Sequence, residues 1–190
     1  SNIRKGALEN LYNMIHSCDD DEIILTLDGD DWFIDNDVLN KLNKIYQNQN
    51  IWLTYGQYKA SNSSEIGCSK EIPRRVIDSS NYRSHPWCTS HLRTFYSWLF
   101  KKINKEDLLY ENSFFTMAWD VAFMLPMLEM TGGKFKFVSD ILYVYNVENP
   151  INDWKVNQNL QIKLEKFIRK KNKYPRVESP INKMFFIRSK

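Results

Sequence analysis

Apolar and polar positions follow two different periods along this chain, and these periods predict alternating helices and strands. Helical spacing of apolar residues predicts helices over residues 4–17, 38–46, 120–129 and 156–171, with a short helix over 97–103. Shorter runs of branched and aromatic residues predict strands over residues 22–27, 51–55, 89–95, 135–138 and 141–145. Helices and strands that alternate in this way indicate an α/β domain.

Turn-forming residues mark the stretches between these elements. Ser, Asn and Gly are frequent over residues 60–70, which predicts a mobile loop, and a proline sets a non-helical context for residues 81–88. Pro126 is expected either to bend the helix that contains it or to lie in an early turn of that helix. Near the end of the chain we expect a tail in which Met184 to Ile187 add an edge strand.

Three carboxylates occupy four positions directly after the first predicted strand, at Asp28, Asp30 and Asp31. Carboxylates this close raise one another's pKa values, so the arrangement favours a bound cation, and hard oxygen ligands suit a divalent metal. An ordinary Asp-Gly turn is the alternative. An EF-hand is excluded, because the sixth and twelfth loop positions counted from Asp28 are Phe33 and Leu39 instead of Gly and Glu.

A phosphatase of the haloacid-dehalogenase type also places Asp-x-Asp after an apolar strand, with the first Asp, here Asp28, as the nucleophile. Such enzymes usually continue with a small residue and Thr or Val, whereas this chain continues with Asp31 and Trp32. The phosphatase remains a third alternative.

Length and composition fit one enzyme-sized domain with a tail. A chain of 190 residues can bury a sizeable core, and its net charge of +3, spread over 26 basic and 23 acidic residues, does not predict nucleic-acid binding. The densest basic run, residues 163–173, interleaves with apolar positions and predicts the solvated face of a terminal helix. No apolar stretch is long enough to predict a transmembrane segment, and there is no signal-peptide pattern.

The three cysteines, Cys18, Cys68 and Cys88, are widely spaced and include no Cys-x-x-Cys pair. They predict neither a zinc site nor a redox motif, and they favour a reducing compartment, so we expect a cytoplasmic protein.

Three groups of residues occur together in the first two-thirds of the chain: Asn2, Gly6, Ala7 and Asn10 on the first helix; Asp28-Gly29-Asp30-Asp31; and Trp119-Asp120 at a helix start. Their combination resembles family-2-type glycosyltransferases of the GT-A fold, and the stretches 91–95 and 145–153 are similar to a bacterial and giant-virus branch of that family. The resemblance covers roughly residues 2–155, which would form the catalytic region that binds metal and acceptor, while residues 156–190 would form a C-terminal helix and tail.

The resemblance implies a GT-A-like, Rossmann-like mixed central sheet flanked by helices. It also implies an inverting transfer of sugar from a nucleotide-sugar donor, UDP-linked, to a hydroxyl of a glycan or protein acceptor. Mn²⁺ or Mg²⁺ would stabilise the departing diphosphate as a Lewis acid. Asp30 would be the principal metal ligand, Asp28 would lie near the metal or the ribose, and Asp31 would orient the loop or a metal-bound water.

The same resemblance makes Asp120 the general base that takes the proton of the acceptor hydroxyl. A helix N-terminus stabilises a carboxylate before it takes a proton. The alternative from local sequence alone is that Asp120 is a helix N-cap.

Aromatic and histidine side chains are further candidates for acceptor binding. Trp119 and Trp87 would stack on sugar faces, with core packing as the alternative for each. His85 and His91 would contact the acceptor or the diphosphate, and the alternative is that both are hydrogen-bonded packing residues.

Cationic and amide side chains are candidates for the donor diphosphate: Arg93, Arg4, Lys5 and Asn146. Arg4 and Lys5 are explained nearly as well by a solvent-facing helix start. Many relatives carry His or Arg where this chain has Asn146, so the resemblance leaves the third protein ligand of the metal open, with Asn152 or Asp153 as replacements.

Members of the family begin with a strand-helix-strand unit that binds the nucleotide base, whereas this chain begins at the helix that precedes the acidic loop. We therefore expect a sheet that is incomplete on its N-terminal side and exposes an edge, with the missing half on a longer polypeptide or on a partner chain. A non-catalytic glycan-binding or interaction module that retains the fold is the second functional hypothesis.

Overall fold

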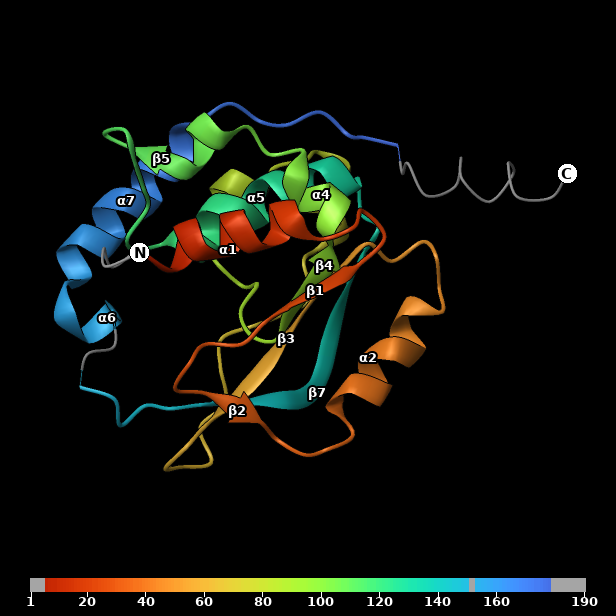
Figure 1. Cartoon of the computed structure of the whole chain (residues 1–190), viewed down its shortest axis with the longest axis vertical. Helices are drawn as coiled ribbons and strands as arrows, with labels where there is room; N and C mark the ends of the chain where they lie inside the picture. The colour runs from red at the N-terminus through yellow and green to blue at the C-terminus, as the bar shows by residue number, and fades with distance from the viewer. Residues whose placement is uncertain (1–5, 151–152, 179–190) are drawn as a thin grey trace, which may run out of the picture.

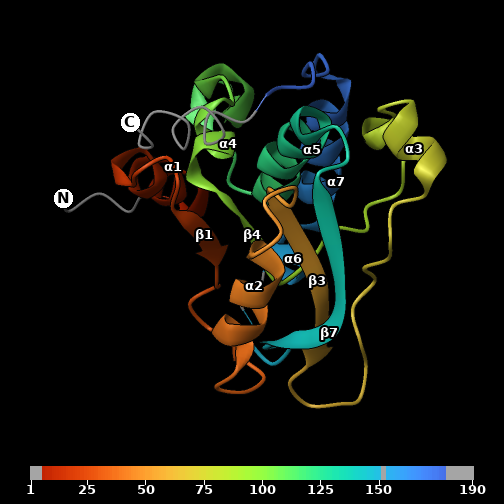
Figure 2. The ribbon, with the colours of Figure 1, turned by 90° about the vertical axis from the view of Figure 1, so that its right-hand side faces the viewer.

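A computed structural model describes residues 6–150 and 153–178, and it shows a curled, mixed sheet of five strands (Figure 1). In spatial order the strands are β1 (Ile23–Thr26), β4 (Arg93–Tyr96), β3 (Leu53–Ala60), β7 (Phe135–Tyr145) and β2 (Trp32–Phe33). Strands β3 and β7 are parallel, as Figure 2 shows side by side, and the other neighbouring pairs are antiparallel. The α/β class and the mixed sheet expected from the sequence are confirmed.

Helices lie on both faces of this sheet. One face carries α1 (Ala7–Ser17), α4 (Ser97–Lys101), α5 (Trp119–Thr131) and α7 (Gln158–Lys170), whose apolar residues form the larger core with sheet residues such as Tyr55 and Phe95 (Figure 1). The other face carries α2 (Val38–Tyr46), which packs on Leu142 and Tyr143 in a smaller core. The helices predicted over residues 4–17, 38–46 and 120–129 correspond to α1, α2 and α5, and α1 begins at Ala7; α1 and α2 bury one apolar side each.

Helix α5 runs through the larger core instead of along its surface. Every residue from Val121 to Thr131 is buried, which explains why its apolar positions surround the helix. Pro126 lies in the middle of the helix, not in an early turn, and Gly132 ends the helix in the left-handed conformation, at φ 59°. Only the first turn, with Trp119 and Asp120, is partly exposed.

Strand β7 corrects the prediction of two separate strands over 135–138 and 141–145. Along the pair with β3, Val138 lies opposite Gly56 and Ile141 lies opposite Gln57, so Ser139 and Asp140 form a bulge. A bulge keeps the backbone extended but interrupts the alternation of side chains, and that interruption divided the prediction.

Two other predicted boundaries are wrong. The strand predicted over 89–95 begins only at Arg93, because the preceding backbone turns toward the 69–70 segment, where the Ser90 N–H donates to Ser69 Oγ at 3.0 Å. The helix predicted over 156–171 is divided at Asn157, whose side chain accepts a hydrogen bond from the Leu160 N–H at 3.0 Å and caps α7.

Several short elements were not predicted, because they contain too few residues to show a period. They are α3 (Arg74–Asp78), α6 (Asp153–Val156), the 3₁₀ turns η1 (Tyr82–Ser84) and η2 (Lys105–Leu108), and the hairpin strands β5 (Leu109–Tyr110) and β6 (Ser113–Phe114). The edge strand predicted at Met184 to Ile187 lies outside the described residues, as do Asn2, Arg4, Lys5 and Asn152.

A buried ion pair fixes the C-terminal part of the described chain to the core. Arg83 Nε lies 2.7 Å from Glu129 Oε1, and Arg83 Nη2 lies 2.9 Å from Glu129 Oε2. Arg83 Nη1 also donates to the Ile168 carbonyl at 2.8 Å, and the Tyr174 N–H donates to Glu129 Oε2 at 3.0 Å. Helix α7 and the segment after it therefore pack on the same core as the sheet.

Strand β1 is at one end of the sheet, and its outer edge pairs with no strand of the described residues. Ile23 and Leu27, at either end of this strand, are exposed apolar side chains. Across residues 6–150 and 153–178, none of the helices combines the length and apolar character that a membrane crossing requires.

Candidate functional site

The acidic loop, residues 28–31, connects β1 to β2, which lie at opposite ends of the curled sheet. The Asp31 N–H donates to the Asp28 carbonyl at 3.1 Å and closes a turn between these residues. The turn that the sequence offered as an alternative is therefore present. This turn keeps the three carboxylates in one short loop, so it is compatible with a role for them in binding a cation.

Asp31 is buried, and both oxygens of its carboxylate accept hydrogen bonds. The Tyr143 hydroxyl donates to Oδ2 at 2.5 Å, and the Asn146 N–H donates to Oδ1 at 2.7 Å. Burial raises the pKa of Asp31, although these two bonds act in the opposite direction. Of the two roles expected for Asp31, orienting the loop agrees with these contacts, because its oxygens face β7 and not a ligand.

Asp28 and Asp30 are the carboxylates left to face a ligand. Asp30 is exposed, and its Oδ2 accepts a hydrogen bond from Asn149 Nδ2 at 2.5 Å. Asp28 is half-buried, and burial raises its pKa to about 6; the nearby charge of Arg93 opposes this shift, while the charges of Asp31 and Asp120 add to it. A half-buried carboxylate among other carboxylates gains most from a cation.

Asp28 and Asp30 suit a Mg²⁺ or Mn²⁺ ion that takes its other ligands from phosphate oxygens and water, because Mg²⁺ in nucleotide sites is usually held by one or two carboxylates. Within the described ranges, no group of three or more His, Cys, Asp and Glu side chains is arranged to hold a metal ion by itself. Asp31 thus does not complete a three-carboxylate site.

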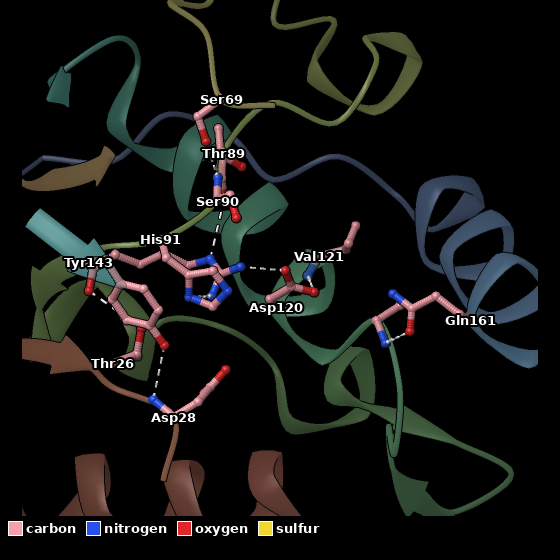
Figure 3. Close-up of polar contacts among 12 residues, drawn as sticks. Thr26, Asp28, Ser69, Thr89, Ser90, His91, Asp120, Val121, Tyr143 and Gln161 are labelled. Atoms are coloured by element: carbon pink, nitrogen blue, oxygen red, sulfur yellow. Dashed lines mark hydrogen bonds and ion pairs between the residues drawn. The ribbon is translucent and has the colours of Figure 1, made fainter. Parts of the chain in front are cut away.

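Asp120 lies in the first turn of α5 beside Val121 (Figure 3). It is paired with Arg93. Arg93 Nη2 donates to Asp120 Oδ2 at 2.6 Å, and the Val121 N–H donates to Oδ1 at 2.9 Å. The N-cap position of α5 is Ala118, so the alternative that Asp120 is the helix N-cap is wrong. The carboxylate keeps a side-chain exposure of 20%, whereas that of Arg93 is 3%.

Arg93 is held on three sides. Its Nε donates to the Thr89 carbonyl at 3.3 Å, and its Nη1 lies 3.3 Å from His91 Nδ1. The guanidinium, which we expected to contact the donor diphosphate, also bonds Asp120. Spacing along the sequence contains no signal for this pair, because the two residues are brought together by the packing of α5 on the sheet.

His91 is buried between aromatic rings. Its ring stacks on that of Tyr143 with centroids 4.5 Å apart and on that of Tyr145 at 5.7 Å. Burial, together with the neighbouring charge of Arg93, holds the pKa of His91 well below its ordinary value of 6.5, so the imidazole is neutral. The packing alternative describes His91 well, although it also borders the cleft described next.

A cleft of about 450 Å³ opens beside Asp120. Its lining residues come from several separate parts of the chain: Tyr58, Cys68, Ser90, His91, Arg93, Asp120, Tyr145, Val147 and Lys155. Asp28 lies within electrostatic reach of both Arg93 and Asp120, and Figure 3 shows Asp28, Tyr143, His91 and Asp120 in one region. Asp28 of the acidic loop is thus close enough to the start of α5 to sense its charge, although the loop itself does not line the cleft.

The remaining predicted residues lie elsewhere. Trp119 packs against Phe123, with ring centroids 5.8 Å apart, at the border of the larger core. Trp87 and His85 line a separate narrow cavity behind Cys88. For Trp119 and Trp87 these contacts favour the core alternative. The Asn146 side-chain oxygen accepts a hydrogen bond from the Glu148 N–H at 3.1 Å. The group of Asn146 that reaches the acidic loop is its backbone N–H and not its side-chain amide.

Sequence reasoning missed Tyr143, Asn149, Tyr58 and Tyr145. Tyr143 and Tyr145 are two positions apart in a strand, so period-two spacing places them on the same face, and that signal was available. Tyr58 and Asn149 have no such signal, because their place at the site depends on how β3 and the 146–149 segment pack.

Comparison of the chain with protein-family models and with curated proteins found no match.

Proposed function

We propose that this chain is the metal- and acceptor-binding part of an inverting glycosyltransferase with a GT-A-like fold. The observation that supports the proposal best is that Asp28 of the acidic loop lies within electrostatic reach of Asp120 and Arg93, which pair with each other and line one cleft. The carboxylates of the acidic loop can bind a cation, whereas the separate, ion-paired carboxylate of Asp120 can act as a base. Sugar transfer from a nucleotide diphosphate uses both of them.

In the proposed reaction, an acceptor hydroxyl attacks the anomeric carbon of the donor sugar. The new bond joins the acceptor oxygen to that carbon, and the bond between the carbon and the diphosphate oxygen breaks, with its electron pair leaving on the nucleoside diphosphate. The hydroxyl proton passes to the carboxylate of Asp120. One displacement from the opposite side inverts the configuration at the anomeric carbon.

Different residues of the site have different roles in this proposed reaction. Mn²⁺ or Mg²⁺ held by Asp28 and Asp30 would supply Lewis-acid stabilisation of the departing diphosphate. Asp31 and Tyr143 fix the loop that carries those two carboxylates. Arg93 fixes the Asp120 carboxylate toward the cleft, and each carboxylate oxygen keeps a further lone pair that can accept the acceptor proton.

We also propose that another strand pairs with the outer edge of β1, on a longer polypeptide or a partner chain. The support is the unpaired edge of β1 among the described residues and the exposed apolar side chains Ile23 and Leu27 at its ends. A strand added here would lie next to the acidic loop, where the base and ribose of a nucleotide would need further contacts.

The test is thermal unfolding with MnCl₂ and UDP, using the longest polypeptide that the gene encodes. A ligand at a hundred times its Kd stabilises the folded state by about 2.7 kcal/mol, which raises the melting temperature by several degrees. We expect this shift with Mn²⁺ and UDP together, and we expect Asp30→Ala to abolish it. Asp21→Ala, which removes an exposed carboxylate before β1, is the control and should keep the shift. No shift in the unmodified protein, or a full shift in Asp30→Ala, would overturn the proposal.

A further inference from the structure

The cleft beside Asp120 has one aromatic wall, and we infer from it that the acceptor is a carbohydrate whose pyranose ring packs against Tyr58 and Tyr145. This inference rests on the proposed function, because it identifies the substrate that Asp120 deprotonates. The sequence allowed either a glycan or a protein as the acceptor, and the inference selects a glycan.

The two tyrosine rings lie side by side and are inclined to each other. Their centroids lie 5.2 Å apart and their planes are inclined by 52°. Both side chains line the cleft and are only partly buried. An aromatic face offers apolar area with little entropy to lose, and the phenol hydroxyl adds a polar group at its edge. The C–H groups on one side of a pyranose ring need such a face, while its hydroxyl groups need polar partners around the edge.

Polar and charged side chains that could hydrogen-bond to sugar hydroxyl groups line the rest of the cleft. Asp120 and Arg93 lie at one side, Ser90 lies nearby, and Lys155 reaches the cleft from α6. The Lys155 ammonium donates to the Val147 carbonyl at 2.5 Å, which fixes it near the rim. A lipid chain would cover these polar groups without offering them any hydrogen-bond partner in place of water, which is costly.

The position of the Tyr58 ring is set by the backbone beside it. Gly67 folds back on β3, where its N–H donates to the Tyr58 carbonyl at 2.9 Å. A Cβ atom at Gly67 would lie 2.3 Å from Cε1 of the Tyr58 ring, so only glycine leaves room for this ring. His91 lies on another side of the ring, with centroids 5.9 Å apart. Tyr58 is therefore held in place before any ligand binds, which lowers the entropic cost of binding.

The sheet offers no place for an extended peptide at this cleft. Near Tyr58, one edge of β3 pairs with β7, and the other edge is taken by the 65–67 segment, whose Gly67 N–H donates to the Tyr58 carbonyl. Tyr145 is on β7, which pairs with β3 on one side and with β2 on the other. Peptides that bind along a sheet need a free strand edge. The volume of about 450 Å³ instead lies in the range of sites for small molecules or for the end of an oligosaccharide.

Cys68 provides a direct assay, because it is exposed and lines the same cleft. The alkylation rate of each cysteine is measured by mass spectrometry with iodoacetamide, in the presence of methyl glycosides of glucose, galactose and N-acetylglucosamine. At a glycoside concentration twice its Kd, Cys68 should react about threefold more slowly. Cys18, which lies at the end of α1 and does not line the cleft, is the internal control and should react at an unchanged rate.

Variants separate ring stacking from general blocking of the cleft. Tyr145→Ala and Tyr58→Ala should lose the protection of Cys68, whereas Tyr145→Phe and Tyr58→Phe should keep most of it. Gly67→Ala moves the Tyr58 ring without removing it and should also weaken protection. Melting temperatures show which variants are folded, and Tyr145→Phe against Tyr145→Ala remains informative if Tyr58→Ala fails to fold.

The outcomes distinguish this inference from the proposed function. Protection by none of the glycosides, protection that the alanine variants keep, or protection by serine and threonine peptides instead of glycosides would overturn it. The shift in melting temperature with Mn²⁺ and UDP does not depend on the two tyrosines, so its presence without glycoside protection rejects the inference alone. Glycoside protection without that shift supports the sugar site and rejects the glycosyltransferase, leaving the non-catalytic glycan-binding module.

Discussion

The hydroxyl of Tyr143 donates to Asp31 Oδ2 at 2.5 Å, and thereby joins the middle of the sheet to the acidic loop. The same hydroxyl accepts a hydrogen bond from the Asp28 N–H at 3.3 Å. One buried phenol thus bonds both ends of the turn that carries the candidate metal ligands. The loop is ordered by protein contacts, and the carboxylates of Asp28 and Asp30 remain available for a ligand.

Tyr143→Phe should therefore loosen the acidic loop. It removes both bonds and leaves Asp31, which is buried, with one partner fewer, so we expect a loss of about 1–3 kcal/mol in the free energy of unfolding. The measurement is urea unfolding, followed by the melting shift with Mn²⁺ and UDP, which should become smaller. Tyr12→Phe on α1 is the matched control and should change neither quantity. Unfolding and ligand shifts equal to those of the unmodified protein would show that the phenol does not order the loop.

The raised pKa of Asp28 predicts how stability depends on pH. The ordinary pKa is 3.8 and the folded chain raises it to about 6, so between these values the folded chain keeps a proton that the unfolded chain has lost. The free energy of unfolding should fall as the pH rises through this window and stay lower above it. Cation binding needs the ionised form, so Mn²⁺ affinity should increase as the pH rises through about 6.

Asp28→Asn tests this dependence. The variant should be more stable than the unmodified protein at pH 8, and the difference should disappear near pH 4. His91 acts in the opposite direction, since its lowered pKa costs stability as the pH falls below 6.5, but it is common to both proteins and cancels in the difference. Urea unfolding at pH 4.5, 6 and 8 gives the comparison, with Asp21→Asn as the exposed control. A difference that does not vary with pH would contradict the linkage to Asp28.

How far the sequence predicts this fold depends on the range of the interactions involved. The amphipathic helix over 38–46 is α2 with the same limits, because its period reports directly which side is buried. The helix predicted over 120–129 lies wholly within α5, and Gly132 ends it as expected. The bulge at Ser139 and Asp140 was not predictable, because it arises from pairing with a strand that lies far away in sequence.

The candidate site shows the same difference between features that depend on local sequence and features that depend on distant contacts. The acidic loop is a local signal, and so is Asp120 at a helix start. The partner of Asp120 is not, because Arg93 reaches it only after β4 and α5 have packed together. The prediction that Arg93 contacts the diphosphate rests on its charge alone, and charge cannot show which carboxylate is near. Of the tyrosines of the cleft, Tyr145 lies in a predicted strand, whereas Tyr58 lies beyond the strand predicted over 51–55; strand prediction also does not show which face borders a cavity.

Asp120→Asn should separate binding from catalysis. The amide keeps an oxygen that can accept from Arg93, but it cannot take a proton, so we expect the transfer rate to fall about 10²- to 10⁴-fold while the Mn²⁺ and UDP melting shift remains. Release of UDP from UDP-linked sugars with a glycoside acceptor is the assay, and Asp140→Asn on β7 is the control. Release of phosphate from an aryl phosphate that depends on Asp28 and not on Asp120 would instead indicate the phosphatase.

The buried pair of Arg83 and Glu129 should contribute far more to stability than an exposed pair of the same chemistry. Their side chains are 5% and 0% exposed, whereas those of Arg74 and Asp78 are 84% and 58% exposed. Arg83→Met leaves the Glu129 carboxylate buried without its cation and should cost about 3–5 kcal/mol, while Arg74→Met should cost about 1 kcal/mol or less.

The double variant Arg83→Met with Glu129→Leu completes this test by urea unfolding. It removes both charges, so much of the loss in Arg83→Met should be recovered, because the cost of the single change is mainly that of an unpaired buried charge. Since Glu129 Oε2 also accepts the Tyr174 N–H, recovery should be incomplete by roughly the value of one hydrogen bond, about 1 kcal/mol. Equal costs for Arg83→Met and Arg74→Met would show that the segment after α7 is held by its apolar contacts and not by this pair.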